Sequence, residues 1–387
     1  MRTSRHGLNR RQFVRSTALG LAALPFLRTD VDAFGRVFTL PRAKSRVAVV
    51  YATDRKRGVA DVLKLLNPVG MNGKRVVIKP NFNSADATPA STHNDTLSQL
   101  VTEMHERGAR SITLGESSGP PVTKNVMTQK GTFDLASDLR FDVVDFEQLT
   151  DADWKPLPLQ GTHWADGLAV PRLVADAEYL VSTCCLKTHG SGGVFTMSLK
   201  LAVGLTPKRI RRAMHSSPDM RRMIAEINTG YTPQLIVLDG IAAFTDGGPS
   251  RGELKAGNVM IAGHDRVAVD AVGVAMLKTL GANQAIMSRG VFEQEQIARA
   301  AELKLGAQSA NEIEIIRGCA QSGAAKDFRR RSAKALSGDD DRYRQGCAGF
   351  HPGEACLYQP RQEASRDAVY RCDLRAGDQP VWQPEGA

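Results

Sequence analysis

The chain has 387 residues, of which 42% are hydrophobic and 24% are charged, and its formal net charge is +10. This composition excludes a wholly disordered or fibrous chain, and six cysteines are too few for a disulfide scaffold. Much of the positive charge lies in residues 1–33 and in two short basic runs, 208–212 and 329–331. Because no aromatic residues are interleaved with these runs, we expect solvated faces and no nucleic-acid partner. The run 208–212 could also bind a small anion.

Residues 1–33 have the composition of an export signal. Arg10 and Arg11 precede Phe13, and the apolar stretch that follows over residues 18–27 is too short to span a bilayer. The pattern resembles the twin-arginine signal, whose machinery exports folded proteins, so we expect a periplasmic or secreted protein. An amphipathic helix or uncleaved anchor is the alternative. No later run of about eighteen apolar residues occurs, so no membrane span is expected in the mature protein.

Apolar β-branched runs alternate with amphipathic stretches along the rest of the chain. The expected strands cover residues 46–51, 75–78, 111–114, 141–144, 177–183, 235–238 and 312–316. The expected helices cover residues 59–66, 94–107, 265–280 and 292–305. This alternation predicts an α/β fold, with a mostly parallel sheet and helices on both faces. We expect one α/β domain, or two lobes, over residues 34–318 and a low-order C-terminal tail over residues 319–387.

Functional side chains are expected where the predicted strands end, because ligands of open parallel sheets bind beyond the carboxyl ends of the strands. The second strand ends at Lys79, which could bind an anion, with Asn81 to orient it. The third strand leads into Glu116, Ser117 and Ser118 between two glycines, where backbone N–H groups could cradle an oxyanion and Glu116 could act as base or ligand. An ordinary turn is the alternative for both segments.

The segments that follow the later predicted strands carry lysine and histidine residues. Lys187 and His189 lead into a glycine-rich loop, where burial would lower the pKa of the lysine and place that of the histidine near working pH. Lys200, a further anion-binding cation, and His215 follow on nearby segments. Asp239 ends another strand, and with His189 and His215 it would complete a three-residue set for a divalent metal.

Taken in order, these segments resemble the bacterial and archaeal family called domain of unknown function 362, over residues 46–318. The resemblance implies an α/β protein without a settled activity. Some members carry a ferredoxin-like module that this chain lacks, and Leu201 stands where the family usually has asparagine. The lysine- and histidine-rich segments are also reminiscent of the nickel-dependent lactate racemase family. The matching pieces are Val77-Ile78-Lys79-Pro80-Asn81, Gly115-Glu116-Ser117-Ser118-Gly119, Leu186-Lys187-Thr188-His189, Ser198-Leu199-Lys200, Gly204, His215, Asp239-Gly240, Gly247-Gly248-Pro249 and Val269-Asp270-Ala271.

The first functional hypothesis is an exported enzyme that acts on a small anionic substrate. Lys79, Lys187 and Lys200 would bind negative charge, and His189 or Glu116 would transfer a proton next to a carboxylate. The cofactor is unknown, with a divalent metal as one candidate. The alternatives are a periplasmic binding protein for an anion or a metal, and an iron–sulfur or redox accessory protein.

The cysteines give the redox alternative little support in the sequence. The chain has no CxxC pair, and Cys184 and Cys185 are adjacent on a predicted strand, where such residues usually act as small apolar side chains. Three further cysteines, Cys347, Cys356 and Cys372, are spaced for neither zinc nor an iron–sulfur cluster.

Overall fold

The computed structural model describes residues 43–165 and 167–318. The predicted export signal and the predicted tail with its four cysteines lie outside the described residues. The chain divides into two units, Met1–Asp339 and Asp340–Ala387, and every described residue belongs to the first. None of the described helices has both the length and the apolar character that a membrane crossing requires.

The described strands form a large mixed sheet and one small hairpin. The strands of the large sheet are β1 (Ser45–Tyr51), β2 (Arg75–Lys79), β3 (Ser111–Glu116), β4 (Asp142–Asp145), β7 (Tyr179–His189), β8 (Val194–Thr196), β9 (Leu235–Gly247), β10 (Gly252–Gly263) and β11 (Ile313–Arg317). Their order is β11-β1-β10-β9-β7-β2-β3-β4, with β8 paired to β7. The β10 pairs with β1 and β9, and the β7–β8 pair, are antiparallel; the other pairs are parallel. The hairpin joins β5 (Trp154–Pro156) to β6 (Ala169–Pro171).

Helices and short 3₁₀ turns connect these strands. The α-helices are α2 (Arg55–Leu66), α3 (Asn94–Glu106), α4 (Thr123–Gln129), α5 (Thr132–Leu139), α6 (Arg172–Ala175), α7 (Ser198–Leu201), α8 (Lys208–Ser216), α9 (Met220–Ile227), α10 (Arg266–Thr279), α11 (Gln284–Met287) and α12 (Glu295–Glu302). The 3₁₀ turns are η2 (Phe146–Gln148), η3 (Asp151–Asp153), η4 (Ala202–Leu205), η5 (Asn228–Gly230), η6 (Val291–Glu293) and η7 (Ala310–Glu312).

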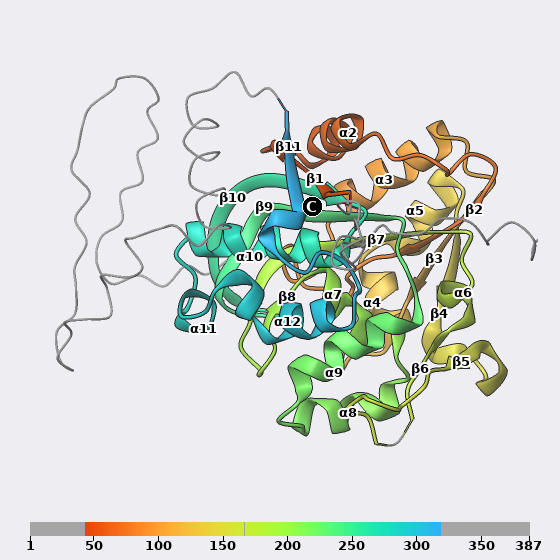
Figure 1. Cartoon of the computed structure of the whole chain (residues 1–387). Coiled ribbons are helices and arrows are strands. Elements are labelled where there is room, and N and C mark those ends of the chain that lie inside the picture. The colour runs from red at the N-terminus through yellow and green to blue at the C-terminus, as the bar shows by residue number, and fades with distance from the viewer. Residues whose placement is uncertain (1–42, 166, 319–387) are drawn as a thin grey trace, which may run out of the picture. The chain divides into compact units, whose positions relative to one another are not determined.

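The two faces of the sheet are covered by different helices, as β1 illustrates. Val47 and Val49 pack into the core cluster that contains α10, whereas Ala48 and Val50 pack into the cluster that contains α2 and α3. This alternation is what a strand buried on both faces requires, since successive side chains point to opposite sides. Figure 1 shows α2 and α3 on one side of the sheet and α10 and α12 on the other. The predicted α/β fold class is confirmed.

Two differences from the predicted strands bear on the site. The fifth predicted strand is longer than expected: β7 continues to His189, so Lys187 and His189 lie on the strand itself rather than on a loop. The antiparallel strand β10 was not predicted, because its first half is exposed and carries charged residues and glycine rather than an apolar run. The β9–β10 turn bonds to the end of β7, where the Gly190 N–H donates to the Gly248 carbonyl at 3.1 Å.

Candidate functional site

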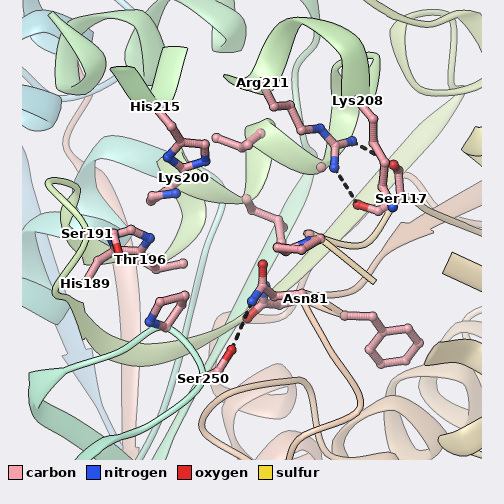
Figure 2. Close-up of a pocket in the computed structure, with 18 of the residues that line it drawn as sticks. Asn81, Ser117, His189, Ser191, Thr196, Lys200, Lys208, Arg211, His215 and Ser250 are labelled. Carbon is pink, nitrogen blue, oxygen red and sulfur yellow. Dashed lines mark hydrogen bonds between the residues drawn. The ribbon is translucent and has the colours of Figure 1, made fainter. Parts of the chain in front are cut away.

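A cavity of about 650 Å³ lies where β2, β3 and β7 end, a volume within the range of small-molecule sites (Figure 2). The ends of neighbouring parallel strands meet at this edge of the sheet, as predicted. Among the described residues, five cationic side chains line the cavity against a single carboxylate, and two histidines complete the titratable lining. These residues are Lys79, Lys200, Lys208, Arg211, Arg212, Glu116, His189 and His215.

Lys79 and Glu116 form a buried ion pair in the wall of the pocket. The Lys79 ammonium donates to Glu116 Oε1 and to the Pro80 carbonyl, the latter at 2.7 Å. The Glu116 carboxylate also accepts the backbone N–H groups of Phe82 at 2.9 Å and Ser117 at 2.7 Å. Burial lowers the pKa of Lys79 despite its partner. Because the carboxylate accepts several hydrogen bonds and balances a buried charge, its geometry favours a structural role over that of a base.

Lys187 lies behind the pocket and does not line it. Its ammonium is fully buried and donates to Asn81 Oδ1 at 2.8 Å and to the Ala90 carbonyl at 2.5 Å. Burial lowers the pKa of Lys187 to about 8, in the direction that the sequence predicted. Lys187 therefore positions Asn81, whose side chain faces the cavity (Figure 2).

His189 has an environment that the sequence did not predict. Its Nδ1 accepts the backbone N–H of Gly193 at 3.3 Å, so the neutral ring carries its proton on Nε2. Burial, followed by the charges of Lys200 and His215, lowers the pKa of His189 to about 2. The expectation of a histidine that titrates near working pH is therefore wrong. As a neutral ring with Nε2–H, His189 is suited to donate a hydrogen bond to a ligand.

The structure does not bring together the three residues predicted to bind a metal. The rings of His189 and His215 are nearly parallel, with centroids 6.5 Å apart. Asp239 is fully buried elsewhere, accepting Arg55 Nε at 2.8 Å and Thr96 Oγ1 at 2.9 Å. Among the described residues, no group of three or more His, Cys, Asp or Glu side chains could hold a metal ion. Asp239 is thus the partner of an arginine from α2. The residues around Asp239 do not predict this contact, because the arginine lies on a distant segment of the chain.

Arg211 ties helix α8 to the turn after β3. Its guanidinium donates to the Ser118 carbonyl at 2.6 Å, to Ser117 Oγ at 2.7 Å (Figure 2) and to the Thr206 carbonyl at 2.6 Å. Burial lowers the pKa of Arg211 to about 10, which leaves it charged near neutral pH. Ser117 lines the pocket as predicted, whereas Ser118 is fully buried and does not.

Lys200 lies in the short helix α7, which a buried carboxylate holds in place. Asp270 accepts the backbone N–H groups of Ser198 and Leu199, both at 2.8 Å. Burial raises the pKa of Asp270 to about 7, opposed by these two hydrogen bonds. Burial, followed by the nearby charge of Lys187, lowers the pKa of Lys200 to about 7.

The basic run on α8 was predicted to be a solvated face, and the structure places part of it in the pocket. Lys208, Arg211 and Arg212 line the cavity, whereas Arg209 does not. Their spacing of three and four residues puts the three side chains on one helix face, which is the sequence signal that distinguishes them from Arg209. Lys208 is paired with Glu147, and Arg212 is exposed at the pocket.

Gly204 allows η4 to approach the buried ion pair, and adding a methyl group there is expected to disturb it. In Gly204→Ala, the new Cβ would lie 2.9 Å from Lys79 Nζ and 3.3 Å from Glu116 Oε1. We expect a loss of about 1–3 kcal/mol in the free energy of unfolding, measured by urea denaturation. Gly190→Ala is the matched control, because its Cβ would meet no atom nearer than 3.5 Å. Equal stability of the two variants would contradict this account of Gly204.

The described cysteines offer nothing to the redox alternative. Cys184 and Cys185 are free and buried. Burial raises the pKa of Cys185 to about 12 and that of Cys184 well above its ordinary value, so neither forms a thiolate near neutral pH.

Comparisons with known proteins identify relatives. The sequence model of the family described as Domain of unknown function (DUF362) matches residues 76–275. The thylakoid-associated protein sll1697 of Synechocystis sp. is 25% identical over 230 residues, covering 55% of this chain and 68% of that protein. The lactate racemase apoprotein from Thermoanaerobacterium thermosaccharolyticum is a solved structure with a TM-score of 0.39 and 16% identity, covering 58% of this chain. The match spans about half of that structure's chain, 54%.

Proposed function

The chain belongs to the DUF362 family, and for this member we propose an enzyme that acts on a small organic anion bound in the pocket at the ends of β2, β3 and β7. The observation that carries the proposal is the charge of the lining. Five lysines and arginines surround the cavity, and the one carboxylate among the described lining residues, Glu116, is already paired with Lys79. An anion is the ligand that would balance this excess of positive charge.

The histidine and the unpaired lysine favour an enzyme over a passive receptor. His189 presents a neutral Nε2–H beside Lys200, and such a donor can stabilise negative charge that develops on a substrate oxygen. Among the described residues no carboxylate pairs with Lys200, whereas Lys79 and Lys208 each have one. A buried ammonium that served only as a positive charge would usually have such a partner. Proton transfer next to a carboxylate is the reaction class that these groups support.

The proposal is tested by anion binding to variants of α8. Calorimetric titration with lactate, malate, citrate and inorganic phosphate is expected to find a ligand whose affinity falls as salt is added. Arg212→Ala should weaken that ligand by about fivefold, because a screened ion pair contributes roughly 1 kcal/mol. Arg209→Ala removes the same charge from the same helix outside the pocket and should bind as the wild type does. Failure of every anion to bind, or equal losses in both variants, would contradict the proposal.

Turnover separates the enzyme from a binding protein for the same anion. Proton NMR in deuterated water should show exchange or conversion of the bound anion by the wild type. His189→Phe should reduce that rate by about a hundredfold or more through loss of the Nε2–H donor, with binding changed far less. Binding without exchange or conversion in the wild type would favour the receptor.

We also propose that residues 1–33 direct export through the twin-arginine machinery, so that the protein acts in the periplasm or outside the cell. The support is the sequence alone: Arg10 and Arg11 before Phe13, then the short apolar stretch. A folded fluorescent reporter carrying residues 1–33 should reach the periplasm, and lysine at both positions 10 and 11 should retain it in the cytoplasm. Export of both reporters, or of neither, would contradict the proposal.

A further inference from the structure

Lys200 differs from the other lysines around the pocket in having no partner within residues 43–165 and 167–318. Lys79 is paired with Glu116, and Lys208 is paired with Glu147. Lys187 donates two hydrogen bonds behind the pocket. The Lys200 amine makes no hydrogen bond or ion pair with any part of the chain that the structure describes, although its side chain lines the cavity and the residue is only 7% exposed.

The fold holds this unpaired amine in a defined place. Helix α7 begins at the Asp270 carboxylate, and Asn228 Nδ2 donates to the Leu199 carbonyl at 3.0 Å on the same short helix. Gly193 packs against the end of the lysine stem, since a Cβ there would lie 2.8 Å from Lys200 Cε and 2.9 Å from His189 Nδ1. The amine and the imidazole therefore lie against the same glycine, and Figure 2 shows both on one side of the pocket.

An unsatisfied hydroxyl beside this pair also points to a ligand. Thr196 lies on β8 and lines the cavity, yet its Oγ1 is buried and has no hydrogen-bond partner among the described residues. Buried polar atoms are nearly always satisfied, so an orphan at a pocket wall is a site for a ligand atom or a water molecule. In Figure 2, Thr196 lies with His189 and Lys200.

We propose that Lys200 is a catalytic nucleophile, whose amine forms an imine with the carbonyl carbon of a bound oxo acid. The inference rests on the proposed function, because the surrounding cations would bind the carboxylate of that substrate. The amine must be unprotonated to attack, and desolvation together with neighbouring positive charge is how proteins produce such an amine. Lys200 has both conditions, since it is buried and Lys187 and Arg211 are nearby.

The step balances without an oxidant or a reductant. The amine lone pair attacks the carbonyl carbon, a C–N bond forms, and the carbonyl electrons move to the oxygen. A proton passes from nitrogen to that oxygen to give a carbinolamine. The C–O bond then breaks as a second proton, taken from solvent, converts the departing hydroxide to one water molecule, which leaves the imine protonated. The His189 Nε2–H would stabilise the developing negative charge on the oxygen. In pyruvate or 2-oxoglutarate, the protonated imine then withdraws electrons from the neighbouring methyl or methylene carbon, so a proton on that carbon, one position beyond the carbon that carries the carboxylate, becomes acidic.

Borohydride trapping tests the inference on the full-length protein. Glyoxylate, pyruvate and 2-oxoglutarate are each incubated with the protein, sodium borohydride reduces any imine to a stable secondary amine, and peptide mass spectrometry locates it. We expect one adduct, on the peptide that contains Lys200, with at least one of the three acids. Lys200→Arg should lose the adduct, and Lys124→Met, which removes an exposed lysine of α4, should keep it.

The outcomes separate this inference from the function on which it rests. Lactate and citrate have no ketone or aldehyde, so their binding reports the anion site alone. If they bind and no oxo acid gives a Lys200 adduct at a saturating concentration, or if adducts spread equally over other lysines, the imine is overturned and the anion site stands. If none of the three oxo acids binds, the oxo-acid assignment is overturned as well. If no anion of any kind binds, the proposed function itself fails.

Discussion

Lys200→Met is expected to make the protein more stable and, at the same time, to abolish trapping and turnover of a carbonyl substrate. The wild-type lysine is only 7% exposed and its amine has no partner among the described residues, so its protonated form is poorly solvated in the folded state. Methionine fills a similar unbranched volume without a charge. Groups retained for function at the expense of stability behave in this way. We expect the free energy of unfolding at pH 7 to rise by about 2–4 kcal/mol.

The pH dependence of that gain has a definite sign. The pKa of Lys200 is about 7 in the folded protein, against an ordinary value of 10.5. Between these two values the unfolded chain binds more protons than the folded protein, so the wild type loses stability as the pH falls through this window. The difference between Lys200→Met and the wild type should therefore be near zero above about pH 10.5, grow down to about pH 7 and stay constant below it.

Urea denaturation of both proteins across this range provides the measurement. Lys124→Met is the control for a lysine exposed on the surface, and it should follow the wild type at every pH. A Lys200→Met variant that is less stable at all pH values would show that the amine has a partner in the folded protein. A constant difference across the window would show that its pKa is not lowered.

The sequence predicted most strands of the sheet and part of the pocket because both depend on local patterns. Apolar β-branched runs located β2, β3 and β7, and the residues after them, such as Lys79, Asn81 and Ser117, reach the cavity. The rest depends on contacts between segments far apart in the chain. Asp239 is bound by Arg55, 184 positions earlier, and Lys187 is held by the loop after β2.

Titration behaviour was the least predictable property of the site. In the sequence, His189 precedes a glycine-rich loop, and a general base would suit the same position. Its pKa depends instead on burial, on the Gly193 N–H at Nδ1 and on Lys200, which approaches from another element. The pKa of Lys200 likewise depends on burial and on the charges of Lys187 and Arg211, which come from other elements. No local pattern encodes which acid pairs with which base.

Glu116→Gln is expected to destabilise the protein by about 3–5 kcal/mol, because removing one member of a buried ion pair leaves the other charge uncompensated. The two side chains are 1% and 2% exposed, so water cannot replace the lost carboxylate at Lys79. The amide would also oppose the N–H donors of Phe82 or Ser117 with its own NH₂ group. Urea denaturation at neutral pH measures the loss.

Two further variants test whether the loss of stability comes from breaking the buried ion pair or from replacing any carboxylate near the pocket. Glu147→Gln removes the carboxylate partner of Lys208, but there the side chains are 21% and 30% exposed, and we expect a loss of about 1 kcal/mol. Adding Lys79→Met to Glu116→Gln removes the stranded charge and should recover part of the stability, so the two changes combine non-additively. Additive losses would mean that Lys79 and Glu116 contribute independently, and the charge balance of the pocket would then have to be reassigned. If Glu116→Gln lost no more stability than Glu147→Gln, water would have to reach the Lys79–Glu116 pair. That result would contradict the burial on which the proposed charge balance of the pocket depends.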